Sequence, residues 1–140
     1  MGGPVDDAMT IAASGMAAAM ASLNASASNV ANANSAGPAP DFTPVNAQSP
    51  ASVYKPAVVI ETSMAGGGVS ATVTRYSPGA ILSYDPTAPF ANGQGMVAVP
   101  NVDFATEAVN QLSASLAFRA NLKVFQAANR NLDSLLNILV

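Results

Sequence analysis

Apolar residues at both ends of the chain recur at helical spacing, whereas those in the middle do not. The N-terminal set is seven residues apart with further apolar residues between: Met9, Met16, Leu23 and Val30, with Ala12, Met20 and Ala27. The C-terminal set repeats this spacing: Phe118, Phe125, Leu132 and Leu139, with Leu122 and Leu136. Because such spacing places side chains on one side of a helix, the pattern predicts two long helices that pack against other helices.

The N-terminal helix is predicted from about Ala8 to Ala31. Asp6 and Asp7 precede it, and carboxylates in this position favour a helix start. The segment 32–38 follows with Asn, Gly and Pro residues, which is typical of a helix end. The predicted helix carries no charged side chain, so we expect more than one of its sides to be covered.

The C-terminal helix is predicted from Val102 to about Leu139, with Asn101 as its N-cap. Asp103 and Glu107 place negative charge in its opening turns, where the helix dipole favours it. The apolar seam changes side near the middle of this helix, so we expect its two halves to face different partners. The helix is also several turns longer than the N-terminal one, and its end must pack against something else.

The middle of the chain has a different character, because nine of the ten prolines lie between residues 37 and 100. Short runs typical of β-strands occur there: Val53–Thr62, Val69–Tyr76, Ile81–Tyr84 and Met96–Val99. Gly66, Gly67 and Gly68 separate the first two runs and predict a hairpin. Residues 36–52 and 85–95 are predicted to be loops. This segment is too short for a large core of its own, so we expect it to lean on the helices or on neighbouring subunits.

These elements predict a mainly α protein, in which long N- and C-terminal helices pack as a coiled-coil-like pair with a small β-hairpin and loop segment inserted between them. We expect residues 1–35 and 102–140 to form a terminal helical domain, and residues 36–101 a Pro/Gly-rich β and loop segment. The residues predicted to pack between subunits are Met9, Met16, Met20, Leu23, Val30, Val109, Leu112, Leu116, Phe118, Leu122, Phe125, Leu132 and Leu136.

Composition argues against site chemistry. Only 9% of the residues are charged, well below the usual quarter, and the chain has no cysteine and no histidine. It therefore lacks a thiolate nucleophile, a zinc knuckle and the commonest general base. We predict no catalytic, metal or cofactor residue, no small-molecule substrate and no enzyme activity. A net charge of −3 with five scattered basic residues also argues against nucleic acid.

Other candidate features have simpler explanations. Asp103 and Glu107 lie one helical turn apart without a third ligand nearby, so helix-start electrostatics is favoured over a cation site. The glycines at 66–68 are followed by neither Lys-Ser/Thr nor a helix, as a phosphate loop requires. Serines 113 and 115 have no partner histidine for nucleophilic catalysis. Arg119 and Lys123 are expected to form a solvated face or to pair with acid on a neighbour.

The start of the chain does not resemble a secretory signal, because Asp6 and Asp7 stand where a signal peptide needs basic residues. Residues 8–40 contain no charged side chain, but their apolar content is mostly alanine and is interrupted by asparagine and serine. A membrane-spanning helix needs about 20 strongly apolar residues. A tightly packed helix is therefore favoured over a membrane span.

Two stretches match the pattern of a known family. One comprises 84–89, Gly95 and 99–103, followed in order by 107–110, 113–115 and 120–124; the other is the Asn-rich run 27–35. The first closely resembles the FlgC family of flagellar basal-body rod proteins, and the second is similar to a motif shared by flagellar rod and hook proteins. The chain departs from the family at Met96, where an aromatic residue is more usual, and at 116–118, where the family run is more polar.

The resemblance implies a structural subunit of the proximal rod, which assembles helically through its terminal helices and transmits torque. It implies export in an unfolded state by the flagellar type III apparatus, without a cleaved signal peptide, to the periplasmic rod of the basal body. The implied partners are other copies of the chain, other rod proteins, the export apparatus and membrane-ring components. Another flagellar axial or type III-secreted adaptor protein would use the same helices, and a longer middle domain would favour it. A small enzyme or binding module would instead need a concave site with clustered polar side chains.

Overall fold

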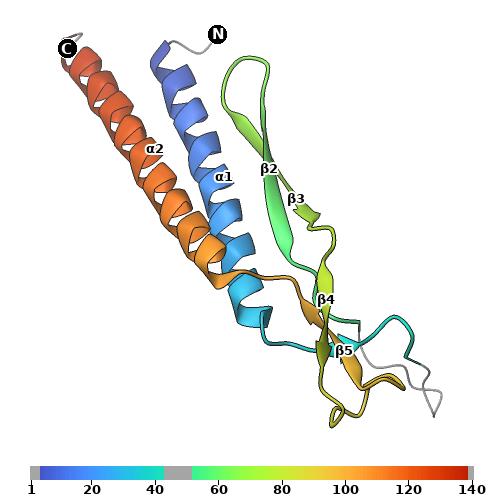
Figure 1. Ribbon diagram of the computed structural model, residues 1–140. Helices are drawn as coiled ribbons and strands as arrows, with labels where there is room; N and C mark the ends of the chain where they lie inside the picture. The colour runs from blue at the N-terminus through green and yellow to red at the C-terminus, as the bar shows by residue number, and fades with distance from the viewer. Residues whose placement is uncertain (1–3, 43–51, 139–140) are drawn as a thin grey trace.

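The computed structural model describes residues 4–42 and 52–138. Two long antiparallel helices dominate it: α1 spans Pro4–Asn32 and α2 spans Phe104–Ile138 (Figure 1). Helix α1 lies between α2 and a β-hairpin, and a small three-stranded sheet lies beyond the end where α1 finishes and α2 begins. Two helices packed together, with a small β segment between them in sequence, confirm the coarse prediction.

The hairpin consists of β2 (Ala57–Ser63) and β3 (Val69–Arg75), which pair antiparallel with Ala57 opposite Arg75 and Ser63 opposite Val69. The three glycines between the strands, at 66–68, all have positive φ angles, which residues with a Cβ rarely adopt. Both strands contact α1 along its length. The predicted hairpin is therefore present, although its first strand begins four residues later than expected, and it leans on a helix as expected.

The second sheet has the strand order β1-β5-β4, formed by Gly37–Pro38, Met96–Pro100 and Ala80–Tyr84. All of its pairings are antiparallel. The central strand β5 is the most buried, with Val97 only 2% exposed. Strand β1 was not predicted, because a glycine and a proline are too short a run to show strand periodicity.

Helix α1 begins earlier than predicted, at Pro4, a residue whose fixed φ suits the first turn of a helix. It ends where Ser35 donates hydrogen bonds to the Asn32 carbonyl from both its amide and its hydroxyl. By length and composition alone α1 could span a membrane, with a mean hydropathy of 1.2 over its most apolar stretch. Here its buried faces contact α2 and the hairpin and include Ser26 and Asn29, a polar pair that indicates a packed protein helix.

Candidate assembly interface

Small residues on α1 form its contact with α2. Ala12, Ala19 and Ser26 are buried and seven residues apart, and each is followed three residues later by a residue on the same face: Gly15, Ser22 and Asn29. A Cβ built on Gly15 would lie 2.6 Å from Oδ1 of Asn121 in α2. The Asn121 side chain therefore occupies the space that a side chain at residue 15 would need. We call these six positions the small-residue seam.

The facing side of α2 also follows a heptad. Glu107, Ala114 and Ala128 are buried and Asn121 is half-buried, each seven residues from the next. Ala114 lines the same cavity as Ala19, and Asn121 lies against Gly15. The pairing of alanine with alanine and of glycine with asparagine follows the antiparallel course of the helices. The two helices therefore meet through small and polar side chains.

One buried cluster joins both helices to the hairpin, and we call it the Asn29 clasp: Asn29, Tyr54, Ala57 and Glu107. The Asn29 Nδ2 donates to the Ala57 carbonyl at 2.9 Å and to Oε1 of Glu107 at 2.7 Å. Its Oδ1 accepts from the Ala57 amide at 2.7 Å and from the Tyr54 hydroxyl at 3.0 Å. Asn29 is only 2% exposed, and it therefore satisfies two backbone groups, a phenol and a carboxylate out of contact with water.

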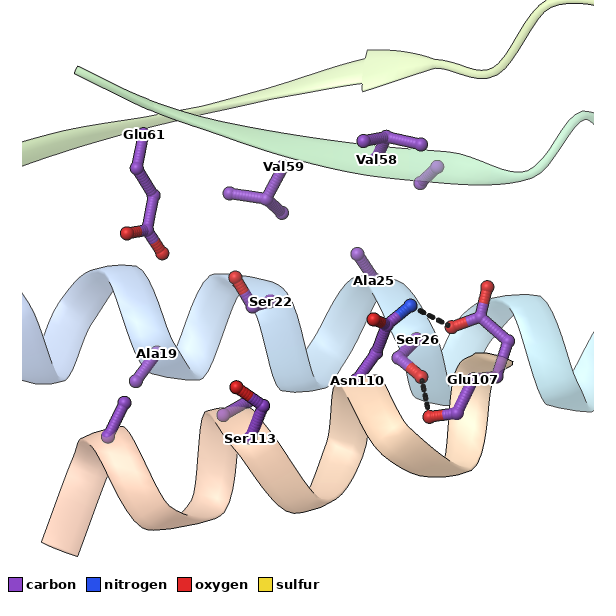
Figure 2. Close-up of a pocket in the computed structure, with 13 residues that line it drawn as sticks. Ala19, Ser22, Ala25, Ser26, Val58, Val59, Glu61, Glu107, Asn110 and Ser113 are labelled. Carbon is purple, nitrogen blue, oxygen red and sulfur yellow. Dashed lines mark hydrogen bonds between the residues drawn. The ribbon is translucent and has the colours of Figure 1, made fainter. Parts of the chain in front are cut away.

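The two bonds to Ala57 reproduce a backbone pairing. An asparagine amide presents one N–H and one C=O side by side, as a paired strand residue does. Asn29 consequently caps the first residue of β2 from the side of α1. Ser26 adds a link between the helices, because its hydroxyl donates to the Glu107 carbonyl at 3.1 Å (Figure 2). Helix α1 thereby fixes both the start of the hairpin and the first turns of α2.

The other end of the hairpin is fixed through Ser14. Its Oγ donates to the Ile11 carbonyl at 2.7 Å and accepts from the Val69 amide at 3.1 Å. The turn lies directly on this part of α1: a Cβ on Gly67 would lie 2.7 Å from the Ile11 side chain, and one on Gly68 would lie 2.5 Å from the Ser14 Oγ. The glycines thus permit both the positive φ angles and the close approach to the helix.

A cavity of about 330 Å³ lies over the small-residue seam, between β2 and α2. In Figure 2, Val59 and Glu61 of β2 extend toward α1, and Ser22 and Ala25 of α1 face them. The walls are mostly Ala, Ser and Val, and Asn110 donates to Oε2 of Glu107 at 3.4 Å. Among residues 4–42 and 52–138, no three acidic, cysteine or histidine side chains gather into a set that could hold a metal ion.

The start of α2 is capped by Asp103 rather than by Asn101. Asp103 accepts hydrogen bonds from the Thr106 hydroxyl at 2.6 Å and from the Ala105 and Thr106 amides at 3.2 and 3.3 Å. The Thr106 hydroxyl, followed by these two amides, lowers the pKa of the Asp103 carboxyl below its ordinary value. Asn101 donates instead to the Pro78 carbonyl, in the connection before β4. The prediction of Asn101 as the N-cap was therefore wrong.

The predicted packing residues fall into two groups. Met9, Met16, Leu23, Val30, Phe118, Leu122, Phe125 and Leu132 are half-buried within the single chain. The others are exposed: Met20 at 48%, Val109 at 65%, Leu112 at 61%, Leu116 at 55% and Leu136 at 55%. The first half of α2 therefore leaves the large apolar residues Val109, Leu112 and Leu116 exposed within the chain, and its Glu107 and Ala114 side faces α1 instead. The predicted contacts of these residues with neighbouring subunits remain predictions.

Sequence reasoning missed the polar members of the interface. Glu107 was assigned only to helix-start electrostatics, and Asn29 only to a family motif. Ser26 was not singled out at all. The available signal was the heptad of small residues from Ala12 through Ala19 to Ser26, which runs beside the more conspicuous methionine and leucine heptad.

Comparisons with known proteins place this architecture in a family. Residues 94–138 match the family described as the flagellar basal body rod FlgEFG protein C-terminal. The flagellar basal-body rod protein FlgC of Salmonella typhimurium is 40% identical over 115 residues, which cover 81% of this chain and 82% of that protein. FlgC of Escherichia coli O6:H1 is 35% identical over 81% of this chain and 82% of its own length, and FlgC of Aquifex aeolicus is 34% identical over 85% of each. The chain belongs to the FlgC family of flagellar basal-body rod proteins and is a structural subunit of the basal-body rod.

Proposed function

We propose that this rod subunit assembles helically in the proximal rod through its two terminal helices and transmits torque from one subunit to the next. The observation that carries the proposal is the apolar side of α2 that the single chain leaves uncovered, at Val109, Leu112 and Leu116. Three large aliphatic side chains more than half exposed on one rigid helix favour burial against another helix. Coiled-coil-like packing would then continue from one subunit to its neighbours.

The internal construction of the subunit suits a load-bearing part. The Asn29 clasp and the Ser14 contact attach the hairpin to α1 at two points about 15 residues apart along the helix, close to 22 Å. A twisting force applied to the hairpin would therefore reach both helices. In this proposal residues 1–35 and 102–140 form the axial helical part, and residues 36–101 form the lateral part that links subunits around it.

The partners in this proposal are other copies of the chain, other rod proteins, membrane-ring components and, before assembly, the type III export apparatus. The chain would reach the periplasmic rod of the basal body unfolded and without cleavage of a signal peptide. Family membership supports the place in the basal-body rod, since the relatives carry the name of basal-body rod proteins. The low charge of the surface supports extensive contact with other proteins.

The test is complementation of a flagellated bacterium that lacks its own FlgC. The unaltered chain is expected to restore motility and to be found in purified basal bodies. Leu112→Asp should abolish rod assembly while the protein is still exported, because a carboxylate buried in a subunit contact costs several kcal/mol at every repeat. Leu112 is exposed in the single chain, so the variant should fold normally.

Asn129→Asp serves as the matched control, since it adds the same charge at another exposed position of α2. It is expected to leave motility unchanged. Absence of the unaltered chain from purified basal bodies, in cells that express and export it, would overturn the proposal. Full motility of the Leu112→Asp variant would show that this side of α2 makes no packed contact.

A further inference from the structure

We propose that the outer side of α2 packs antiparallel against the free side of α1 in a second copy of this chain, with Leu116 beside Met20 and Arg130 beside Asp6. This inference rests on the proposed function and identifies the two surfaces that meet. Its basis is the agreement of two exposed stripes in spacing, in length and in the order of their charges.

The first stripe lies on the side of α2 away from α1. It consists of exposed residues three, four or seven positions apart: Val109, Leu112, Leu116, Arg119, Lys123 and Arg130. Spacing of this kind keeps them on one line along a helix. The stripe is apolar in its first half and basic in its second. None of its three cations has an ion-pair partner among the described residues, and Arg119 donates only to Ser115 on its own helix.

The second stripe lies on the side of α1 that neither α2 nor the hairpin covers. It consists of exposed residues with the same spacing: Asp6, Ala13, Ala17, Met20, Asn24 and Ala27. The stripe is acidic at its N-terminal end, small in the middle and carries one large apolar side chain, Met20. Asp7 adds a second exposed carboxylate next to Asp6.

The two stripes match in antiparallel register over their whole length. Each spans 21 residue steps, or about 31 Å of helix. With Arg130 opposite Asp6, the 3-4 spacing of one stripe, read backwards, coincides with that of the other. Leu116 then lies opposite Met20, Val109 opposite Ala27, and Leu112 opposite Asn24.

The same register also pairs unlike side chains favourably. Arg119 and Lys123 come opposite Ala17 and Ala13, where their methylene stems can lie over small residues while the charges reach water. A parallel register would instead place the carboxylate of Asp6 against Val109 and leave Arg130 over alanine. Charge order thus selects the antiparallel arrangement, which is also the arrangement of α1 and α2 within one chain.

The partner helix belongs to a second copy of this chain, because the chain carries both stripes and the two cannot contact each other within one copy. The α2 stripe faces away from α1, and the α1 stripe faces away from α2 and from the hairpin. Each copy therefore offers a different surface to the copy on either side. Such heterologous contacts generate open helical arrays, as a rod requires.

Disulfide cross-linking tests the register, and because the chain has no native cysteines, only the introduced ones can form a disulfide. Full-length Leu116→Cys and full-length Met20→Cys, each with a different epitope tag, are mixed and oxidised with copper phenanthroline. Leu116→Cys mixed with Ala31→Cys is the off-register control, because Ala31 is exposed on the same side of α1 but 11 residues away. Packing in the proposed register should give about tenfold more product for the first pair, through its higher effective concentration.

The charge order is tested in the same assay. Asp6→Arg in the Met20→Cys chain, or Arg130→Asp in the Leu116→Cys chain, should lower the yield about two- to fivefold, as expected for an exposed ion pair, and the two changes together should restore it. Predominant Leu116–Leu116 product, equal yields from the two cysteine pairs, or no cross-link would overturn the inference. The inference would also be overturned if, in purified basal bodies, the Leu116→Cys chain formed cross-links only with another rod protein. Those outcomes leave the proposed function intact if the unaltered chain still restores motility, so the two failures are distinguishable.

Discussion

Replacing Asn29 with alanine should destabilise the chain by several kcal/mol, because its side chain bonds to three other parts of the fold. The change removes bonds of 2.7 and 2.9 Å to the Ala57 backbone, one of 2.7 Å to Glu107 and one of 3.0 Å to the Tyr54 hydroxyl. Tyr54 is half-buried and can turn its hydroxyl to water. The Ala57 N–H, the Ala57 C=O and the Glu107 carboxylate are buried and lose partners together.

The magnitude follows from these stranded groups. A buried polar group without its partner costs about 1–3 kcal/mol, and three groups that share one lost side chain do not add fully. Water can also enter from the neighbouring cavity of about 220 Å³, which is lined by Asn29, Ala57 and Glu107. A loss of about 3–5 kcal/mol in the free energy of unfolding is therefore expected, a large part of the stability of a domain of this size.

The assay is urea denaturation of the purified chain, followed by circular dichroism, combined with hydrogen exchange at the Ala57 amide. Asn24→Ala is the matched control, since Asn24 is an exposed asparagine on the same helix and should change stability by less than about 0.5 kcal/mol. In Asn29→Ala the Ala57 amide should also lose protection, because its acceptor is gone. Equal stability of the two variants, with unchanged protection at Ala57, would refute the idea that the clasp holds the hairpin to the helices.

Three further predictions follow from other contacts. Gly68→Ala should destabilise the chain by about 1–2 kcal/mol more than Gly66→Ala in urea denaturation, since both glycines have positive φ but only Gly68 lies against Ser14. Equal losses of stability in the two variants would contradict the close contact of the turn with α1. The Asp103 cap stabilises the fold at pH values above the ordinary aspartate pKa, and this stabilisation should disappear as the pH falls through the lowered pKa of the folded state. Asp103→Asn should remove this pH dependence of stability from acid denaturation curves. An acid denaturation curve unchanged by the substitution would contradict the role of Asp103 as a cap. Phe125→Asp should block rod assembly without preventing export, and motile cells carrying that variant would show that residue 125 is outside any packed seam.

The sequence predicted the elements better than it predicted the faces they use. Heptad spacing and end signals located both helices to within a few residues, and three adjacent glycines located the hairpin turn. These features are local, so periodicity and turn chemistry suffice to find them. The strand β1 escaped prediction because it exists only by pairing with β5, more than 50 residues away.

The face that α1 turns toward α2 was harder to predict, because hydrophobicity ranks methionine and leucine above alanine. In the structure Met20 is 48% exposed, whereas Ala19 is 4% exposed. Small side chains on this face of α1 leave room for side chains of α2, as at Gly15, where the Asn121 side chain takes the space. The buried Asn29 was equally invisible to a hydrophobic pattern, because its partners on β2 and α2 lie 28 and 78 residues away.

The absence of charge along α1 has a physical explanation in its three faces. One face packs on α2 through small residues, and a second holds the hairpin through Ser14 and Asn29. A helix with a free third face would normally carry charged residues there, yet between Asp7 and the end of α1 there are none. The charges are confined to its first turn, where the helix dipole favours carboxylates and where the proposed partner helix would be basic. A third face that is small, apolar in its middle and acidic only at one end supports the proposal that this side of α1 packs against another helix in the assembled rod.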